Sequence, residues 1–189
     1  MADFAHLHVH SEYSLLDGVG QLDRIVARAQ ELGMDSLALT DHGVLYGAID
    51  FYTAATSAGV KPIVGCEVYV APEKRTDRRG KSDGNAQHLV LLAQNDTGYR
   101  NLIQLVTRAH LEGFYYKPRV DKELLSQYHD GLICLSACIS GEVPRLVHAG
   151  DRDGARKAAT WYRDVFGKDN YYIEVQRHAG LEWLDDVNR

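Results

Sequence analysis

Histidines occupy alternate positions near the start of the chain, in the stretch HLHVHSEYSLLDG at residues 6–18. In an extended strand the side chains alternate between faces, so His6, His8 and His10 would point the same way. Neighbouring imidazoles bury little apolar surface and favour a strand less than Val or Ile does. A metal ion would compensate, because neutral imidazole is the commonest nitrogen ligand of metals in proteins. The stretch therefore predicts a metal site close to His8, His10 and Asp17.

Further polar side chains stand at the ends of apolar runs that we expect to be strands. Asp41 and His42 follow SLALT, Glu67 lies inside IVGCEVYV, and Cys138 follows GLICLSA. In parallel βα folds, functional groups gather at the carboxyl ends of the strands. His88 departs from this rule because it precedes its strand, QHLVLLA, so a loop or a shifted register would have to bring it to the others.

Each of these residues also has a structural interpretation. A single histidine is more often a hydrogen-bonded core residue than a ligand, and Cys138 alone would be a small buried hydrophobe. Glu67 could be a paired carboxylate or lie at a sheet edge, and Asp41 could cap a helix. The metal hypothesis therefore depends on the whole set. Mixed His, carboxylate and thiolate ligands suit zinc, manganese or iron, and a multinuclear site suits phosphoester hydrolysis.

Composition indicates one soluble globular domain. The chain has 189 residues, of which 45% are hydrophobic and 25% charged, and its net charge of −5 argues against a generally basic surface that coats nucleic acid. Three cysteines without dense spacing do not indicate a secreted disulfide framework. We find no signal peptide and no run of membrane-spanning length, so we expect a cytoplasmic protein without a membrane partner.

Apolar strands alternate with amphipathic helices, which predicts an α/β fold with a parallel sheet, open or closed into a barrel. The expected strands are residues 4–10, 36–40, 61–70, 87–93, 131–137 and 170–176, and the expected helices are 21–33, 46–59, 97–110, 141–149 and 152–166. The long polar loop at residues 71–86 carries basic residues that could attract a phosphate backbone or simply be solvated. These are Lys74, Arg75, Arg78, Arg79 and Lys81. The chain stops inside an apparent helix, so we expect a fragment of a longer chain.

Six longer stretches resemble the PHP (polymerase and histidinol phosphatase) domain at the N-terminus of bacterial DNA polymerase III alpha subunits. They are LHVHSEYSLLDG, ALTDHG, KPIVGCEVYVAP, HLVLLAQNDTGYRNL, GFYYKPRVD and LSACISGEVPRL. The HxH and TDH patterns occur throughout the PHP superfamily, whereas EYSLLDG, NDTGYRNL and YYKPR are specific to the replicative polymerases. The resemblance implies a PHP-type (βα)7 distorted barrel over residues 1–189, incomplete at its C-terminus, with the polymerase palm, fingers and thumb absent.

The resemblance also implies a site with three divalent metal ions, zinc, manganese or iron, and no catalytic residue separate from the metal ligands. The implied ligands are His8, His10, Asp17, His42, Glu67, His88 and Cys138. His6 and Asp41 are candidates for supporting these ligands, and the candidates for contacting phosphate or DNA are Arg75, Arg78, Arg79 and Arg119. The family's late Asp and His have no counterpart before Arg189, so we expect this chain alone to be weakly active or inactive.

The intact HxH pair favours a 3′–5′ exonuclease that proofreads during DNA replication. Its implied partners are DNA, at a 3′ end or primer-template, the remainder of the polymerase III alpha chain, and a proofreading exonuclease subunit. Two alternatives remain open. The domain could be a catalytically silent, metal-stabilised scaffold that supports the polymerase or binds the separate exonuclease. It could also be a stand-alone phosphoesterase of the histidinol-phosphatase type, against which the polymerase-specific stretches argue.

Overall fold

The computed structural model describes residues 4–15, 17–78, 86–178, 180–181 and 184–188. This part of the chain forms a mixed α/β fold around a sheet with the strand order β1-β2-β3-β5-β6, and β4 pairs with β2. The strands are β1 (Ser36–Leu39), β2 (Lys61–Val70), β3 (Gln87–Ala93), β4 (Arg119–Val120), β5 (Leu132–Leu135) and β6 (Tyr171–Tyr172). The helices are α1 (Leu22–Glu31), α2 (Ala48–Ser57), α3 (Asp96–Leu111), α4 (Lys122–Gln127), α5 (Glu142–His148), α6 (Arg152–Phe166) and α7 (Leu184–Val187).

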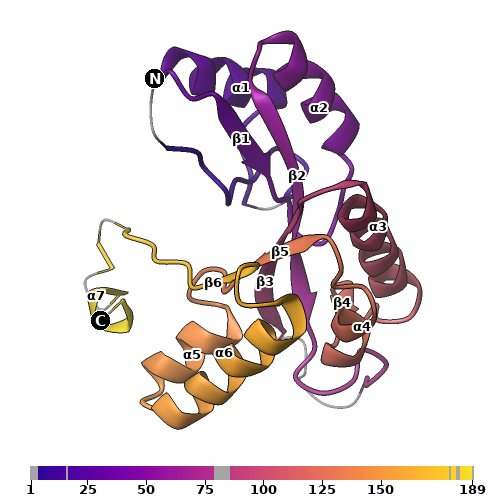
Figure 1. The fold of residues 1–189 in the computed structure, drawn as a ribbon, viewed down its shortest axis with the longest axis vertical. Coiled ribbons are helices and arrows are strands. Elements are labelled where there is room, and N and C mark those ends of the chain that lie inside the picture. The colour runs from indigo at the N-terminus through magenta and orange to yellow at the C-terminus, as the bar shows by residue number, and fades with distance from the viewer. Residues whose placement is uncertain (1–3, 16, 79–85, 179, 182–183, 189) are drawn as a thin grey trace.

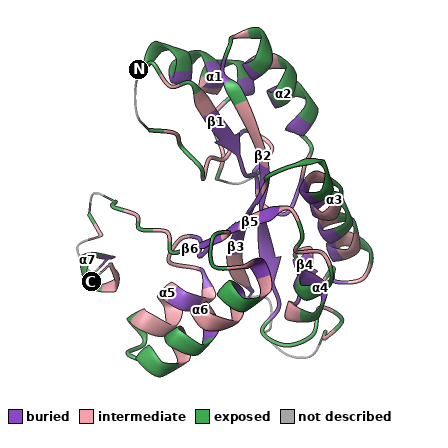
Figure 2. Ribbon diagram, in the orientation of Figure 1, coloured by how far each residue is buried: buried purple, intermediate pink, exposed green. Residues whose placement is uncertain are grey.

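Figure 1 shows β2 as the long central strand of the molecule, with α1 and α2 packed near one end and α3 and α4 beside the other. Two main apolar clusters follow from this arrangement. Leu91 of β3 packs with Leu102 of α3 and Leu124 of α4 in the larger cluster. Val26 of α1 packs with Phe51 of α2 in the smaller one. Figure 2 shows buried residues along the strands and exposed residues on the outer faces of the helices. None of the helices in the described part of the chain is both long and apolar enough to cross a membrane.

The sheet is mixed, so the expectation of a parallel sheet is wrong for one strand. β2 runs parallel to β1 and to β4, and β5 runs parallel to β6, but β3 is antiparallel to both β2 and β5. The connection from β2 to β3 contains no helix in its described residues, 71–78 and 86. A parallel pair needs a crossover, usually a helix, whereas a loop can join antiparallel strands. The reversal places His88, at the start of β3, opposite Tyr69, near the end of β2.

Residues 4–10 are not a strand, contrary to expectation. Ala38 N donates to His6 O at 2.9 Å and Thr40 N donates to Val9 O at 2.8 Å, so the segment lies along β1. The Val9 amide, however, donates to the Thr40 hydroxyl at 2.9 Å instead of a main-chain carbonyl. This side-chain contact interrupts the ladder, although the segment still carries His8 and His10 to the end of β1.

Two short elements, β4 and α4, lie where we expected none. The side chain of Asp121 accepts a hydrogen bond from Leu124 N at 2.9 Å and thereby caps α4. The sequence carries this capping signal, but α4 has only six residues, too few to show a helical period. The expected strand at 170–176 is shorter than predicted, because only Tyr171–Tyr172 pairs with β5.

Candidate metal centre

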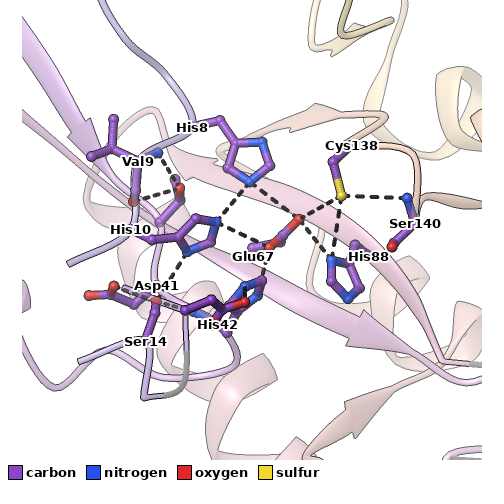
Figure 3. A network of polar contacts seen from close by, with 12 residues as sticks. His8, Val9, His10, Ser14, Asp41, His42, Glu67, His88, Cys138 and Ser140 are labelled. Carbon is purple, nitrogen blue, oxygen red and sulfur yellow. Dashed lines mark hydrogen bonds and ion pairs between the residues drawn. The ribbon is translucent and has the colours of Figure 1, made fainter. Parts of the chain in front are cut away.

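Glu67 lies in β2 at the centre of a cluster of histidines (Figure 3). Its side chain is 1% exposed, and all four surrounding imidazoles lie within ion-pair distance of its carboxylate. The distances are 3.2 Å from His8 Nε2 to Oε1, 3.4 Å from His10 Nε2 to Oε2, 2.7 Å from His42 Nδ1 to Oε2, and 3.1 Å from His88 Nδ1 to Oε1. The structure thus brings together residues that are up to 80 positions apart in the chain, from His8 to His88.

The backbone around each histidine explains this convergence. His42 follows β1 and forms a parallel bridge with Glu67, and Glu67 N donates to Asp41 O at 3.1 Å. His88 N donates to Ser140 O at 3.0 Å, which joins the start of β3 to the loop after β5. Antiparallel pairing of β3 with β2 therefore explains how His88, which begins its strand, reaches the ligands that follow theirs.

Cys138 and Asp17 complete the cluster from two loops. The thiol of Cys138 lies 3.8 Å from Glu67 Oε1 and 3.7 Å from His88 Nδ1. Ala137, directly before it, has a φ of +62°, a left-handed conformation that a residue with a Cβ rarely adopts and that often marks a functional site. Asp17 lies on the open side, where its Oδ2 is 3.1 Å from His42 Nε2.

A buried carboxylate orients the ring of His10. Asp41, 2% exposed, accepts the Ser14 hydroxyl at 2.6 Å, and it also accepts the amide and hydroxyl of Ser11 at 2.7 and 2.8 Å. Because the Ser14 proton is given to Asp41, its oxygen must accept from His10 Nδ1, 3.1 Å away. The proton of neutral His10 is therefore on Nδ1, and the lone pair is on Nε2, which faces Glu67. Asp41 thus supports the cluster without joining it.

Glu174, just beyond β6, orients His8 in the same way, and the sequence analysis missed it. Its Oε1 accepts from His8 Nδ1 at 2.8 Å, which leaves the lone pair of His8 on Nε2. The Glu174 amide donates to Ser136 Oγ at 2.8 Å and fixes the residue beside β5. The available signal was a carboxylate inside the apolar run YYIEV, the same pattern that singled out Glu67.

The arrangement fits a cation. His8 Nε2 and His10 Nε2 are 3.1 Å apart, and in the neutral rings both atoms carry lone pairs, so a proton or a metal ion must lie between or beside them. In the described part of the chain, His42 Nδ1, Glu67 Oε2 and Glu174 Oε2 are buried and make no hydrogen bond of good geometry, although His42 Nδ1 lies 2.7 Å from Glu67 Oε2 as an ion-pair contact. Two ligand atoms each about 2.1 Å from one ion are about 3 Å apart, close to the separations found here. Two triplets could each hold an ion, namely His8, His10 and Glu67, and His42, Glu67 and His88.

The pKa shifts of the clustered residues also indicate that the cluster favours bound positive charge. Burial alone would lower the pKa of His8, but Glu174 and Glu67 outweigh it and raise the pKa to about 9. Burial alone would raise the pKa of Glu67, but the four imidazoles lower it strongly. Burial, and then the charge of Glu67, raises the pKa of the Cys138 thiol to about 11. A metal ion would reverse this last effect, because it binds the thiolate.

Other candidates take different places. His6, a candidate for supporting the ligands, is exposed and packs edge-on against Phe4 with ring centroids 4.9 Å apart. Arg119 is 1% exposed, and its guanidinium donates to the carbonyls of Gly113, Arg75 and Asp77 at 3.1, 3.0 and 2.7 Å.

The side chain of Arg75 is held by acidic groups of the chain itself. Its Nε donates to Glu112 at 2.8 Å, and its guanidinium lies 3.0 Å from Asp121. The structure therefore gives Arg75 and Arg119 internal partners, contrary to the idea that they bind phosphate. Arg78 is exposed, and Arg79 and Lys81 lie outside the described residues.

Residues 6–178 match the PHP domain family. The chain therefore belongs to the PHP domain family. Within it, the sequence is similar to DNA polymerase III alpha subunits. It is 54% identical over 177 residues to that of Treponema pallidum, covering 93% of this chain and 15% of the relative. It is 49% identical over 189 residues to that of Borreliella burgdorferi, covering 98% of this chain and 16% of the relative. The chain thus spans about 15% of the length of these relatives.

Two solved structures are more remote. An amidohydrolase from Chromobacterium violaceum aligns with a TM-score of 0.47 and 15% identity, over 89% of this chain and 84% of that one. A protein of Bifidobacterium adolescentis, provisionally described as a metal-dependent phosphoesterase, aligns with a TM-score of 0.41 and 17% identity, over 84% and 55%. Similarity at this level carries no argument about the site.

Proposed function

We propose that the cluster around Glu67 is a multinuclear metal centre that hydrolyses phosphodiesters. The observation that carries this proposal is the convergence of four imidazoles on the buried carboxylate of Glu67, with His8 Nε2 and His10 Nε2 only 3.1 Å apart. A structural ion pair would bring a fixed cation of its own, whereas these rings balance the carboxylate only by taking a proton or a metal ion from solution. Such a set has a deficit of positive charge that divalent ions would fill.

The donor set divides between three positions in this proposal. His8, His10 and Glu67 would hold one ion, and His42, Glu67 and His88 would hold a second, with Cys138 beside it. Asp17, which contacts His42 on the open side, would complete a third. Divalent ions in such a centre lower the pKa of water and stabilise the negative charge that develops on a phosphate group.

The chain's own residues fix the direction of the ligands. Ser14, held by Asp41, keeps the Nε2 lone pair of His10 aimed at Glu67, and Glu174 does the same for His8. Burial of Glu67 keeps water from competing for its oxygens. These contacts hold the donor atoms in place before any ion binds, which reduces the reorganisation that binding requires.

We infer further that the chain is the PHP domain of a DNA polymerase III alpha subunit, with a 3′ end of DNA as the substrate of a 3′–5′ exonuclease. Sequence identity of about half to such subunits supports this assignment. Its partners would then be DNA, the polymerase part of the same subunit and a proofreading exonuclease subunit, in the cytoplasm.

A scaffold function is the second candidate, and one observation favours it. The ligands come from the segment before α1, the end of β1, β2, β3 and the loop after β5, so bound ions would cross-link most of the sheet. A metal that only stabilises the fold would use the same residues. Hydrolysis separates the two functions, because a scaffold binds ions without turning over a phosphodiester.

The test is hydrolysis of bis(p-nitrophenyl) phosphate, of a 3′-labelled oligonucleotide and of a phosphate monoester, with manganese or zinc. We expect metal-dependent release of 3′ nucleotides that His10→Ala reduces at least about 100-fold, since removing a ligand disrupts the centre. His129→Ala, a histidine outside the cluster that bonds Ser126 O, should leave the rate unchanged. Metal binding without any hydrolysis would favour the scaffold, and hydrolysis of the monoester alone would favour a histidinol-phosphatase type.

A further inference from the structure

An exposed aromatic loop lies between α3 and β4, at residues 113–118 with the sequence GFYYKP. Phe114 is 51% exposed and Tyr116 is 69% exposed, and Lys117 beside them is exposed as well. A group of exposed aromatic rings can mark an interaction site, whereas a single exposed ring is ordinary.

The loop lies against the candidate metal centre. Lys117 Nζ is 4.4 Å from the centre of the Tyr69 ring, and that ring stacks on His42 at 5.8 Å and meets His88 edge-on at 5.1 Å. A Cβ added to Gly43, the residue after His42, would be 2.8 Å from Pro118 Cγ, so the two segments touch. One aromatic ring therefore separates the ammonium group of Lys117 from two of the proposed metal ligands.

Arg119 holds the base of this loop. Its Nε donates to Gly113 O at 3.1 Å, and its guanidinium also binds the carbonyls of Arg75 and Asp77, at the start of the basic loop. A Cβ at Gly113 would be 1.9 Å from Arg119 O, so only glycine allows this closure. The loop is thus fixed at its base while its aromatic tips face solvent.

Tyr116 has a φ of +60°, and Tyr116 and Ala137 are the non-glycine residues with a positive φ in the described part of the chain. A bulky residue in this conformation is strained, and such strain collects at functional sites. The Tyr116 ring meets the Tyr115 ring edge-on with centroids 4.7 Å apart, but it remains 69% exposed and adds little to the core. Its exposed face is open to a ligand.

We propose that Phe114, Tyr116 and Lys117 form a platform that stacks the terminal bases of a single-stranded nucleic acid and contacts its backbone, so that the terminal phosphodiester reaches the metal centre. The proposal rests on the proposed function for the identity of the substrate. Aromatic rings bind single strands because every unpaired base has a stacking face, whereas bases in a duplex are covered by their neighbours. The adjacent ammonium group supplies the charge that a phosphate requires.

The test measures binding without catalysis. A 5′-labelled eight-nucleotide single strand with a free 3′ hydroxyl is titrated with the 189-residue chain in chelator, and fluorescence anisotropy gives the Kd. Tyr116→Asn and Phe114→Ala should each weaken the Kd at least about fivefold, and Tyr116→Phe should retain the affinity. Lys117→Gln should weaken binding and reduce the salt dependence by about 0.7 of a log unit per log unit of salt. Tyr52→Asn on α2 and Lys157→Gln on α6 replace exposed residues elsewhere and should change nothing.

Melting temperatures show whether a loss of binding reflects unfolding. Asparagine tolerates a φ of +60°, so Tyr116→Asn should not lower the melting temperature. Failure of the parent to bind the single strand, or equal Kd values for the parent, Tyr116→Asn and Phe114→Ala, would overturn the proposal and leave a protein partner for the loop.

Hydrolysis separates this proposal from the proposed function. Hydrolysis of bis(p-nitrophenyl) phosphate by the parent chain with manganese tests the proposed metal centre, and the control variants Tyr52→Asn and Lys157→Gln should keep that rate. Absence of hydrolysis by every chain would refute the proposed function while the differences in Kd remained.

Discussion

Two buried ionic networks meet near the end of β2, and they satisfy their charges differently. Around Asp121, which is 2% exposed, the backbone amide and guanidinium of Arg75 and the amide of Leu124 all donate to the carboxylate. Around Glu67, four titratable rings surround the carboxylate at distances of 2.7 to 3.4 Å.

This difference in charge balance distinguishes the structural ion pair at Asp121 from the binding site that we propose at Glu67. The guanidinium of Arg75 is permanently charged and presents fixed donors, so the Asp121 network is complete without any other species. The imidazoles of the Glu67 network are charged only when they gain a proton, so this network needs protons or metal ions from solution. Changes in metal should therefore act on the Glu67 network and leave the Asp121 network unaffected.

Asp121→Ala should have the largest effect on stability. It breaks a buried pair and removes the cap of α4, and we expect it to lower the free energy of unfolding by about 3–5 kcal/mol. Urea denaturation with and without chelator measures the loss, which should be the same in both conditions. Glu123→Ala, an exposed carboxylate in the same helix, is the control. A loss that depended on chelator would contradict the separation of the two networks.

Removal of metal should destabilise the protein through the Glu67 network alone. An ion present at 1,000 times its Kd stabilises the folded state by about 4 kcal/mol, so a strong chelator should lower the melting temperature and manganese or zinc should restore it. Calorimetry measures this shift. In Glu67→Gln the shift should nearly vanish, and a shift of the full size in that variant would place the metal elsewhere.

The response to pH should change sign when metal binds. In the protein without metal, the pKa of His8 is about 9 when folded and 6.5 when unfolded, so its stabilising effect is complete below pH 6.5 and disappears as the pH rises through 9. We expect a decrease of about 3 kcal/mol in the free energy of unfolding between these limits. Below pH 4.5 stability should also fall, because the pKa of Glu67 is lowered in the folded state.

In the protein with metal, the pH dependence of stability reverses. Protons compete with metal for the imidazoles, so stability should rise from pH 5 to pH 8. Denaturation at several pH values, with chelator and with manganese, measures both responses. His8→Gln should abolish most of the alkaline loss in chelator. The same pH response in both conditions would show that the ions do not bind these rings.

Ser14→Ala should have the smallest effect, because Ser14 contacts a proposed ligand and is not one itself. Without the Ser14 hydroxyl the Nδ1 proton of His10 loses its acceptor, and we expect metal affinity to fall about 10–100-fold. Competition with a fluorescent chelator measures the affinity. Ser126→Ala, which removes a hydroxyl bonded to Glu123 O outside the cluster, is the control. An unchanged affinity would mean that Ser14 does not orient His10.

Sequence could predict the parts of the site that depend on local pattern. His8, His10, His42 and Glu67 stand at strand ends or within an apolar run, and these positions indicated a shared edge of the sheet. The position of His88 required the direction of β3, which depends on long-range pairing with β2 and β5.

Other features depend on contacts that no local pattern encodes. Glu174 reaches His8 across 166 residues, and the burial of Arg119 follows from its contacts with two loops. The segment at residues 4–10 has the composition of a strand, but the hydroxyl of Thr40 takes the place of a ladder carbonyl. Such side-chain contacts form only in the folded chain, so a local sequence pattern cannot predict them.

Metal content distinguishes a metal centre at Glu67 from a network of protonated histidines. The chain is dialysed against a mixture of zinc, manganese and iron, and mass spectrometry measures the ions retained per chain, in parallel with Glu67→Gln and Asp121→Asn. We expect two to three ions in the parent and in folded Asp121→Asn, and at most one in Glu67→Gln, because Glu67 belongs to both ligand triplets. No retained ion in the parent, or the same number in Glu67→Gln, would contradict it.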